Sequence, residues 1–454
     1  MGLRKRLCAV VGVLAVCGAS IYAASQSNVL PGVIPENALI ARPTVTLWYT
    51  DETLEDYLAS AALDYLEEYD IRIVPVLKSG LEYLEAVNSA SLNEENAPDL
   101  YIISNDSLEK AYLTGLAVEI EDERGVVTAD NFPQTALDAV TYQEKLVAYP
   151  LYFETSALVY NSTYLQQAAQ ELSVSEAELI PDTIDDILSF ADEYNAPETV
   201  EAVFRWDVSD IFYNYFFAGN YINAGGSCGD DESQIDIYNL EAVKGLQAYQ
   251  ELNQFFSIDS ETSSYDAVVD DFLDGKLVFT VATTDILERI AQRQAEGTFP
   301  YEYAVVPLPD VNDEVSTRGL SVTNAVAVNG YSEKKEMAND FASYLADQGA
   351  EKLYARTGHI SARSGLLAER TGMEGFWEEY ALSYPMPKLM SMANFWVHME
   401  IAYTKVWNGS NVSDILKSLS EQIMTQVTGQ TYVEEVYIEL PTEEETEYDD
   451  EGMD

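Results

Sequence analysis

Strand and helix patterns alternate three times in the first folded part of the chain, and this order constrains the fold more than any other feature. Runs rich in β-branched and aromatic residues, typical of strands, occupy residues 44–52, 70–78 and 97–106. Apolar residues at helical spacing follow each run, over residues 53–69, 81–91 and 107–120. Three such repeats predict an α/β fold with a mainly parallel sheet that helices cover on both faces.

Polar residues stand where two of these strands end. Asp51 and Glu52 follow the first strand, and Asn105 and Asp106 follow the third. In parallel sheets, ligands bind outside the carboxyl ends of the strands. The sequence therefore predicts a ligand site at this edge, although carboxylates in such turns also serve as helix caps.

The rest of the chain is too long to fold around one simple core. Its 454 residues favour two or three domains. Helical patterns recur over residues 182–193, 240–256, 333–346 and 376–427, with an aromatic-rich helix expected over 209–221. Strands are expected over residues 301–310 and 320–332, and a helix, strand and helix within 265–293.

Charge excludes several classes of partner. The chain carries 78 Asp and Glu against 24 Lys and Arg, a formal net charge of −54. Such a surface repels phosphate backbones and anionic lipid headgroups, so we expect neither nucleic acid nor a basic membrane-docking face. It suits an exported protein that stays soluble and monomeric. The only histidines, His359 and His398, offer little for a metal site or Ser-His-Asp chemistry, and no metal or cofactor is expected.

The first 24 residues have the pattern of an export segment. Residues 4–6 are basic and a mostly apolar stretch follows them. Three interpretations remain open, namely lipidation at Cys17, cleavage after Ala23 or Ala24, and an uncleaved membrane anchor. Each of them places the rest of the chain outside the cytoplasmic membrane, with membrane contact only through this segment.

Two further segments are predicted to lie outside the folded body. Residues 25–43 form a short linker, and the acidic residues 431–454 form a disordered tail. Between them Cys228 is the single cysteine, so an internal disulfide is not expected. Its setting, "GGSCGDDES", indicates a small loop residue and not a nucleophile.

Eight segments resemble, in order and spacing, those of extracellular solute-binding proteins of the maltose-binding type (family 1), the binding components of ABC importers. They are "TVTLWYTDE", "APDLYIISND", "LTGLAVEI", "AYPLYFETSALVYN", "FLDGKLVFTV", "YAVVPLPD", "NGYSEKKEMANDFASYL" and "NFWVHMEIAYTKVWNG". The resemblance implies a type II periplasmic-binding-protein-like fold, with two lobes joined by crossing strands and a ligand cleft between them. The implied lobes are residues 44–152 plus 322–360 and residues 153–321 plus 361–430.

The resemblance also implies which residues line the cleft. The matching positions are Asp51, Glu52, Asp106, Glu154, Asp210, Phe212, Asp285 and Trp396. Several neighbours depart from the family pattern, because Ser107 replaces an expected arginine and Ile103 an expected tryptophan. Another expected tryptophan is replaced by Thr284 and Asp285. Core packing is an alternative role for Trp396.

The chemistry of these positions favours a particular kind of ligand. Sugars need flat aromatic faces and carboxylates or amides that accept hydroxyl hydrogen bonds. Five acids with little positive charge near them favour a polyol, a sugar or a cationic solute over a phosphate. Two alternatives remain open. One is a surface-anchored protein of this fold for a polyamine, metal ion or protein partner, and the other is a secreted glycosidase using Glu154 and Asp210.

The predicted mechanism is hinge closure about three crossings. They fall near residues 150–156, 319–324 and 359–365, with hinge residues Pro150, Ser156, Asn324 and Ser361. Because no "GxxxxGK[ST]" loop is present, the ATPase and permease are expected to be separate chains.

Overall fold

The computed structural model describes residues 42–93, 96–260, 263–366, 371–435 and 438. The predicted export segment with Cys17, nearly all of the predicted linker and residues 439–454 of the predicted tail lie outside these ranges. The first part of the predicted tail has a defined place, because the backbone N–H of Tyr432 donates to Thr425 and that of Ile438 to Tyr238. Within the described ranges, none of the helices combines the length and apolar character needed to cross a bilayer.

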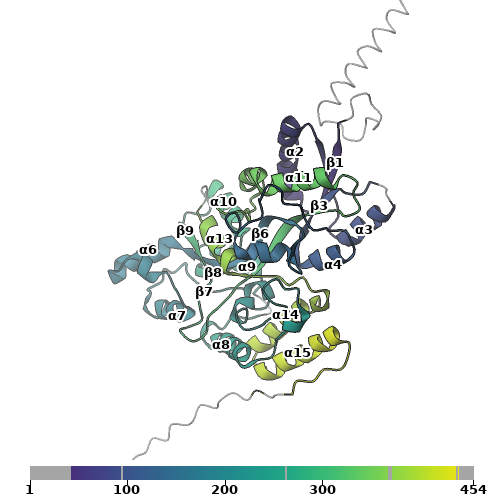
Figure 1. The fold of residues 1–454 in the computed structure, drawn as a ribbon. Coiled ribbons are helices and arrows are strands. Elements are labelled where there is room, and N and C mark those ends of the chain that lie inside the picture. Colours follow the sequence, from purple (N-terminus) through teal and green to yellow (C-terminus); the bar gives the residue numbers. More distant parts are fainter. Residues whose placement is uncertain (1–41, 94–95, 261–262, 367–370, 436–437, 439–454) are drawn as a thin grey trace, which may run out of the picture.

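Within the described residues, nine strands form one curled sheet with the order β2-β1-β3-β10-β6-β8-β7, β9 lying beside β6 and β11 beside β10 (Figure 1). They are β1 (Thr44–Tyr49), β2 (Arg72–Leu77), β3 (Leu100–Ser104), β6 (Tyr149–Asn161), β7 (Ala202–Phe204), β8 (Leu277–Thr283), β9 (Tyr303–Val306), β10 (Leu320–Val328) and β11 (Tyr384–Pro385). A separate hairpin joins β4 (Thr141–Tyr142) and β5 (Lys145–Leu146). The predicted parallel pairing holds for β1, which pairs with β2 and β3. The strands β6 and β10 pair antiparallel to each other. In addition, β6 pairs antiparallel to β8, and β10 pairs antiparallel to β3.

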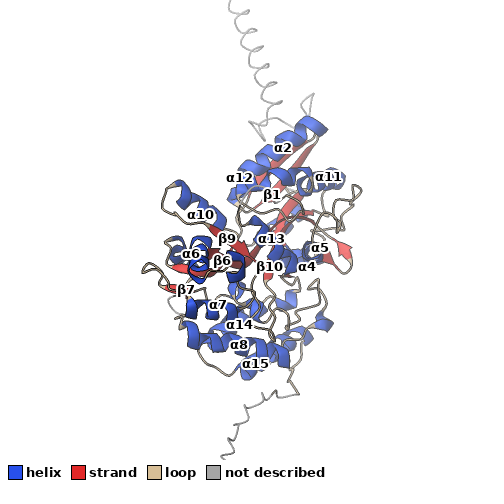
Figure 2. Ribbon diagram, turned by 90° about the vertical axis from the view of Figure 1, so that its left-hand side faces the viewer, coloured by secondary structure: helices blue, strands red, loops and turns tan. Residues whose placement is uncertain are grey.

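Helices pack on the sheet along its whole length (Figure 2). They are α2 (Glu55–Tyr69), α3 (Tyr83–Asn93), α4 (Leu108–Leu113), α5 (Gln134–Val140), α6 (Ser162–Leu172), α7 (Ile184–Glu193), α8 (Leu240–Phe256), α9 (Tyr265–Leu273), α10 (Ile286–Ala295), α11 (Lys335–Ala346), α12 (Leu353–Thr357), α13 (Met373–Leu382), α14 (Phe395–Trp407) and α15 (Val412–Thr428). We call β1, β2 and β3 with their helices the β1 side, and β7, β8 and β9 with theirs the β8 side. In Figure 1 the strand β6 runs between α2 and α11 above and α7, α8 and α15 below.

The predicted helix over residues 209–221 is wrong. The segment forms two short 3-10 turns, Ile211–Tyr213 and Tyr215–Phe217. The side chain of Asn214, between the turns, donates to the carbonyl oxygens of Asp207 and Asp210 at 2.8 and 2.6 Å. An asparagine that captures nearby carbonyls offers the backbone an alternative to a helix, and here that alternative holds.

The long strand β6 crosses from one side to the other. Its first half pairs with β10, and its second half pairs with β8 and β9. The register shifts at Asn324, and Pro150 stands opposite Ala325 at this bulge. Proline has no N–H for the ladder, so inside a sheet it is tolerated at bulges. The sequence therefore marks the place where the strand pairing is irregular.

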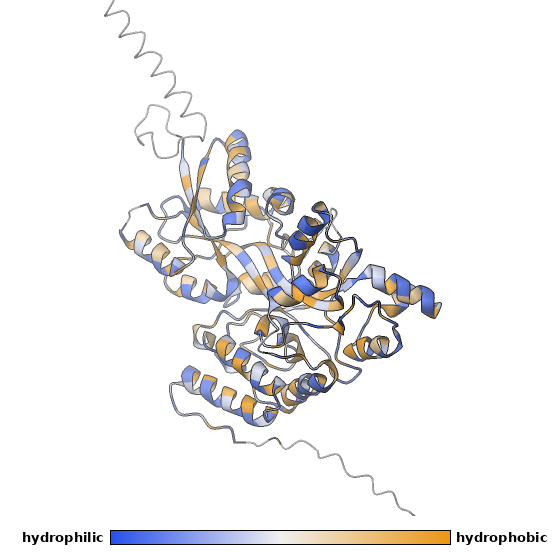
Figure 3. Ribbon diagram, turned by 180° about the vertical axis from the view of Figure 1, so that it is seen from behind, coloured by the Kyte–Doolittle hydropathy of each residue, from blue (hydrophilic) through white to orange (hydrophobic). Residues whose placement is uncertain are grey.

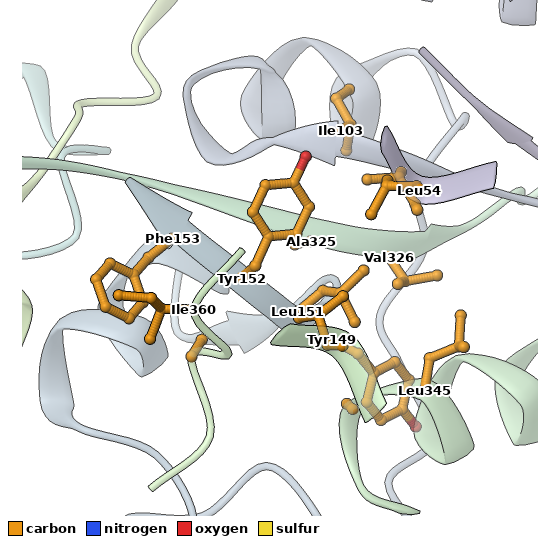
Figure 4. Packing of buried hydrophobic residues seen from close by; sticks show 14 of the residues in the cluster. Leu54, Ile103, Tyr149, Leu151, Tyr152, Phe153, Ala325, Val326, Leu345 and Ile360 are labelled. Carbon is orange, nitrogen blue, oxygen red and sulfur yellow. The ribbon is translucent and has the colours of Figure 1, made fainter. Parts of the chain in front are cut away.

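The other predicted crossing segments lie beside β6. Phe153 N–H donates to Ile360 O at 3.3 Å, and Ser361 forms an isolated bridge with Tyr152. Figure 4 shows Phe153 against Ile360 and Tyr152 on the other face of the strand, directed toward Ile103. Ser156, further along β6, donates its hydroxyl to Phe212 O at 3.0 Å. Whether these residues act as hinges remains a prediction.

Two hydrophobic clusters support this sheet, and apolar residues line its strands and the inner faces of its helices (Figure 3). One cluster extends from β1 and β3 across β6 and β10 to α9, α10 and α13. The other lies between β8 and the helices α7, α8, α14 and α15. Tyr380 of α13 stacks on Phe153 at 3.9 Å, so α13 packs against the crossing strand itself.

Candidate ligand-binding site

A cavity of about 450 Å³ lies between the two sides of the molecule, and we call it the interlobe cavity. The β1 side and the crossing segments contribute Thr53, Glu154, Thr357, Gly358 and His359. The β8 side contributes Phe212, Tyr213, Tyr265, Thr283, Thr284, Asp285 and Glu288. Of the residues predicted from the sequence, the structure therefore brings Glu154, Phe212 and Asp285 together.

Glu154 is the exposed residue in an otherwise buried strand. Its neighbours on β6 are buried, whereas Glu154 lines the interlobe cavity. Partial removal from water raises the pKa of Glu154, repulsion from Asp51 and Asp285 adds to that rise, and the nearby His359 opposes it. Within the described part of the chain no hydrogen bond reaches this carboxylate, so it is available to a ligand.

Asp51 differs from Glu154 because its oxygens already have partners. One oxygen accepts hydrogen bonds from Thr53 N–H at 2.9 Å and from the Thr53 hydroxyl at 2.7 Å. The other lies 2.7 Å from Nε2 of His359 and accepts from the Tyr152 hydroxyl at 3.3 Å. Although burial opposes its charge, the hydrogen bonds to His359 and Thr53 hold the pKa of Asp51 well below its usual range. Asp51 therefore caps a turn and anchors His359.

Aromatic rings form the wall opposite the crossing strand. Tyr213 and Tyr265 stack with ring centroids 4.7 Å apart. The Tyr265 hydroxyl donates to Asp285 at 2.6 Å and accepts a hydrogen bond from Thr283 at 2.8 Å. This network fixes the Asp285 carboxylate at the cavity, beside Phe212. Rings and fixed acceptors in one cavity are the elements that polar organic ligands require.

A second cavity of about 370 Å³ adjoins the first at the Asp51–His359 pair. It lies outside the carboxyl ends of β1 and β3, where the alternating pattern predicted a site, and Asp51, Ile103, Tyr152 and Asn324 help to line it. Lys110 at its edge forms an ion pair with Glu85. Tyr152 lines the second cavity and Glu154 the first, so the two cavities lie along the same face of the crossing strand.

Four predicted ligand residues line neither cavity. Glu52 is exposed in the turn after β1. Asp106 accepts hydrogen bonds from the hydroxyls of Ser104 and Ser107, and Asp210 accepts from Phe212 N–H at 2.7 Å as a helix cap. Trp396 packs edge-on against Tyr215 at 5.8 Å. Their roles in ligand binding remain predictions.

Sequence reasoning did not single out several lining residues. Thr53, Tyr213, Tyr265 and Glu288 belong to helix or turn patterns that carry no signal of a site. His359 had a weak signal, because it opens the third predicted crossing and lies next to the glycine of "TGH". Its contact with Asp51 spans 308 residues of sequence, which periodicity cannot detect.

A third cavity, of about 910 Å³, lies away from the predicted ligand residues, between the β4–β5 hairpin and the loop 225–234. Cys228 lines it, in a loop as predicted, and burial raises the pKa of its thiol. A raised pKa disfavours the thiolate that a nucleophile needs. Among the described residues, no group of His, Cys, Asp or Glu is arranged to hold a metal ion.

Two known proteins of similar sequence are named as sugar-binding proteins. The maltodextrin-binding protein MdxE of Bacillus subtilis (strain 168) is 22% identical over 360 residues, which cover 77% of this chain and 82% of that protein. A galactooligosaccharide-binding protein of the same organism is 20% identical over 421 residues, which cover 89% of this chain and 91% of that protein. No protein-family model matches the chain.

Solved structures agree over nearly the whole described chain. The extracellular solute-binding protein from Staphylococcus aureus in complex with maltose matches with a TM-score of 0.72 and 20% identity, covering 85% of this chain and 98% of its own. A cyclo/maltodextrin-binding protein complexed with maltotetraose matches with a TM-score of 0.71 and 21% identity, covering 87% of this chain and 100% of its own. These matches confirm the predicted two-lobed fold. The matched relatives and structures are also of the maltose-binding type that the eight sequence segments resemble.

Proposed function

We propose that this chain is an extracytoplasmic solute-binding protein that captures a sugar or oligosaccharide in the interlobe cavity. The observation that carries the proposal is the composition of that cavity. It joins a free carboxylate on the crossing strand, Glu154, to a fixed carboxylate and stacked rings on the β8 side. Acceptors for hydroxyls are thus presented from both sides of one cleft, and ring faces for a pyranose from the β8 side.

The comparisons support the same function. The matched relatives are named for binding maltodextrin and galactooligosaccharide, and the matched structures for maltose and maltotetraose. These relatives are named as binding proteins. By the same analogy, the chain delivers its ligand to the permease subunits of an ABC importer and works as a monomer on the outer face of the cytoplasmic membrane. Anchoring through residues 1–24, with lipidation at Cys17, completes this proposal.

A catalytic role as a glycosidase has less support. That reaction needs two carboxylates flanking one glycosidic bond. Glu154 lines the interlobe cavity, but Asp210 does not and instead caps a 3-10 turn. A product-release assay with the sugars below tests this alternative directly.

A thermal-shift screen tests the proposed function. We expect maltotriose, a galactooligosaccharide or another oligosaccharide to raise the melting temperature, because a ligand that binds only the folded state adds about 2.7 kcal/mol at a hundredfold excess over its Kd. Polyols, polyamines, amino acids and divalent cations are the comparison arms. The proposal is wrong if no saccharide shifts the transition while one of these other classes does.

The variant Glu154→Gln tests the site. It keeps the shape of the side chain but removes the charge, so we expect the Kd for the sugar found in the screen to rise by more than about tenfold. Glu154 is exposed and makes no hydrogen bond within the described chain, so the unfolding midpoint in urea should change little. The matched control is Glu67→Gln, which removes the same charge from the exposed face of α2. Equal affinities of all three proteins would refute the assignment of Glu154.

A further inference from the structure

The interlobe cavity holds more negative charge than a neutral sugar requires. Glu154, Asp285 and Glu288 reach it from three places, the crossing strand, the turn before α10 and α10 itself. A Cβ built on Gly358 would lie 3.4 Å from Glu288 Oε2, which places this carboxylate against the crossing segment. Lysine and arginine are absent from the described residues that line the cavity.

The basic side chains near the cavity already have partners. Nε2 of His359 lies 2.7 Å from Asp51, and its ring stacks on Tyr152 at 4.2 Å. Arg289 lies 6.0 Å from the ring of Tyr265, but its guanidinium pairs with Asp266 and Asp270 at 3.0 and 3.1 Å. Three carboxylates therefore line a cavity in which His359 is the only basic side chain among the described lining residues, and His359 is bonded to Asp51.

The other walls suit a saccharide better than a bare amine. The side chains of Thr53, Thr284 and Thr357 border the same space, together with the partly buried ring of Phe212. The hydroxyls of Thr53 and Thr357 already donate to Asp51 and to Leu353 O, and their oxygens can still accept a hydrogen bond from a ligand. Hydroxyl groups and a ring face match the alternating polar and apolar surfaces of a pyranose. An ammonium group on that sugar gains charge-assisted hydrogen bonds from carboxylates and an attraction to the faces of the tyrosines.

We propose that the interlobe cavity prefers an oligosaccharide bearing free amino groups over a neutral one of the same shape, with Glu154, Asp285 and Glu288 receiving the ammonium group. The inference rests on the proposed function, because it names the chemical class of the sugar. A preference for ammonium groups would distinguish this cavity from a cleft that binds neutral glucose polymers through hydroxyl contacts alone.

Calorimetry with matched trisaccharides tests the preference on the intact protein. The β-1,4-linked glucosamine trimer and cellotriose share their linkage and differ by an ammonium group in place of each C2 hydroxyl. At low ionic strength and pH 6.5 we expect the amino trimer to bind at least about tenfold more tightly, since charge-assisted hydrogen bonds are roughly twice as strong as neutral ones. The difference should shrink as salt is added, because salt screens charge pairs.

Two variants locate the effect. Glu288→Gln removes a cavity charge from the exposed surface of α10, and we expect it to lower the affinity for the amino trimer several-fold and by a larger factor than the affinity for cellotriose. Glu67→Gln changes the net charge equally but lies on α2, outside the cavity, and should leave the preference as it is. The N-acetylated trimer, which lacks the charge, should bind no better than cellotriose.

The outcomes separate the two proposals. Equal, salt-independent binding of the amino trimer and cellotriose overturns the charge preference and leaves the proposed function intact. Spermidine binding as tightly as the amino trimer also overturns the inference, because the site would then recognise ammonium without a sugar. If the amino trimer, cellotriose and the sugars of the thermal-shift screen all fail to bind, both proposals are wrong.

Discussion

At the scale of single residues, the most unusual carboxylate is Glu379 of α13, which is buried. It accepts hydrogen bonds from the backbone N–H of Leu308 at 2.8 Å and from that of Gly319. Gly319 permits the close approach, since a Cβ there would lie 2.2 Å from Glu379 Oε1. Burial raises the pKa of Glu379 to about 7, and the two N–H groups and Arg318 only partly offset that rise.

This raised pKa predicts that stability falls between pH 5 and pH 8. The folded state keeps a proton on Glu379 that the unfolded state releases near its ordinary value of 4.5, so the stabilisation is complete below that value and lost as pH rises through about 7. The contribution is at most about 3 kcal/mol at 1.36 kcal/mol per unit of pKa. Urea unfolding at several pH values measures it.

The control for this prediction is Glu379→Gln, which cannot titrate. Its unfolding free energy should depend less steeply on pH than that of the wild type, so the stability of the wild type relative to the variant should fall as pH rises. All other acids are common to both chains, and their repulsion cancels in the comparison. Parallel curves over this range would show that Glu379 keeps an ordinary pKa.

Residue-level reasoning from the sequence located acids but not their partners. The position of Asp51 after a strand predicted an edge-of-sheet site, and Asp51 does border a cavity there. Its bonds to Tyr152 and His359 cross 101 and 308 residues, so they depend on the finished fold. Likewise, nothing in the sequence near Tyr265 indicates that its hydroxyl orients Asp285.

At the scale of elements, the period of the apolar residues predicted helices correctly where a segment is long and amphipathic. The predicted helix over residues 240–256 matches α8, Leu240–Phe256. It failed where side chains compete for the backbone, as Asn214 does between the two aromatic turns. The predicted helix over 107–120 also ends early, because α4 stops at Leu113. Hydrogen bonds from side chains to nearby backbone groups leave no repeat in the spacing of apolar residues, so that spacing does not predict them.

Asn105 connects three elements and gives the element-scale prediction. It is fully buried at the end of β3, its amide donates to Met386 O at 2.6 Å, and its oxygen accepts from Thr323 N–H of β10 at 2.9 Å. Asn105→Ala leaves both backbone groups without partners, so we expect a loss of about 2 to 4 kcal/mol in urea unfolding. Asn93→Ala, at the exposed end of α3, is the control and should change stability by about 0.5 kcal/mol or less. Equal losses in both variants would mean that Asn105 does not hold these elements together.

At the scale of the whole molecule, the order of segments predicted the architecture better than any single motif did. Eight unspecific fragments in a fixed order implied a two-lobed fold, and the structural matches confirm it. The antiparallel pairing of β6 with β10 and the packing of α13 on Phe153 were not predicted, because they join segments far apart in sequence. The lobe boundaries and hinge positions remain predictions.

Hinge closure is the prediction that belongs to this scale. Thr53 and His359 border the interlobe cavity from one side and Tyr265 and Asp285 from the other, so a ligand gains its full set of contacts only when both walls reach it. Because such a ligand binds the closed form better, it shifts the population toward closure. We therefore expect the radius of gyration measured by small-angle X-ray scattering to decrease when the protein is saturated with its sugar.

The control separates closure from solvent effects of the sugar itself. A saccharide that gives no thermal shift, added at the same concentration, should leave the scattering curve unchanged. Glu154→Gln should compact only at higher sugar concentration, in proportion to its weaker binding, because the variant keeps the crossing strands and loses a ligand contact. Saturation shown by calorimetry without any decrease in radius of gyration would mean that the crossing strands hold the lobes in one arrangement, with the ligand entering a cleft that is already formed.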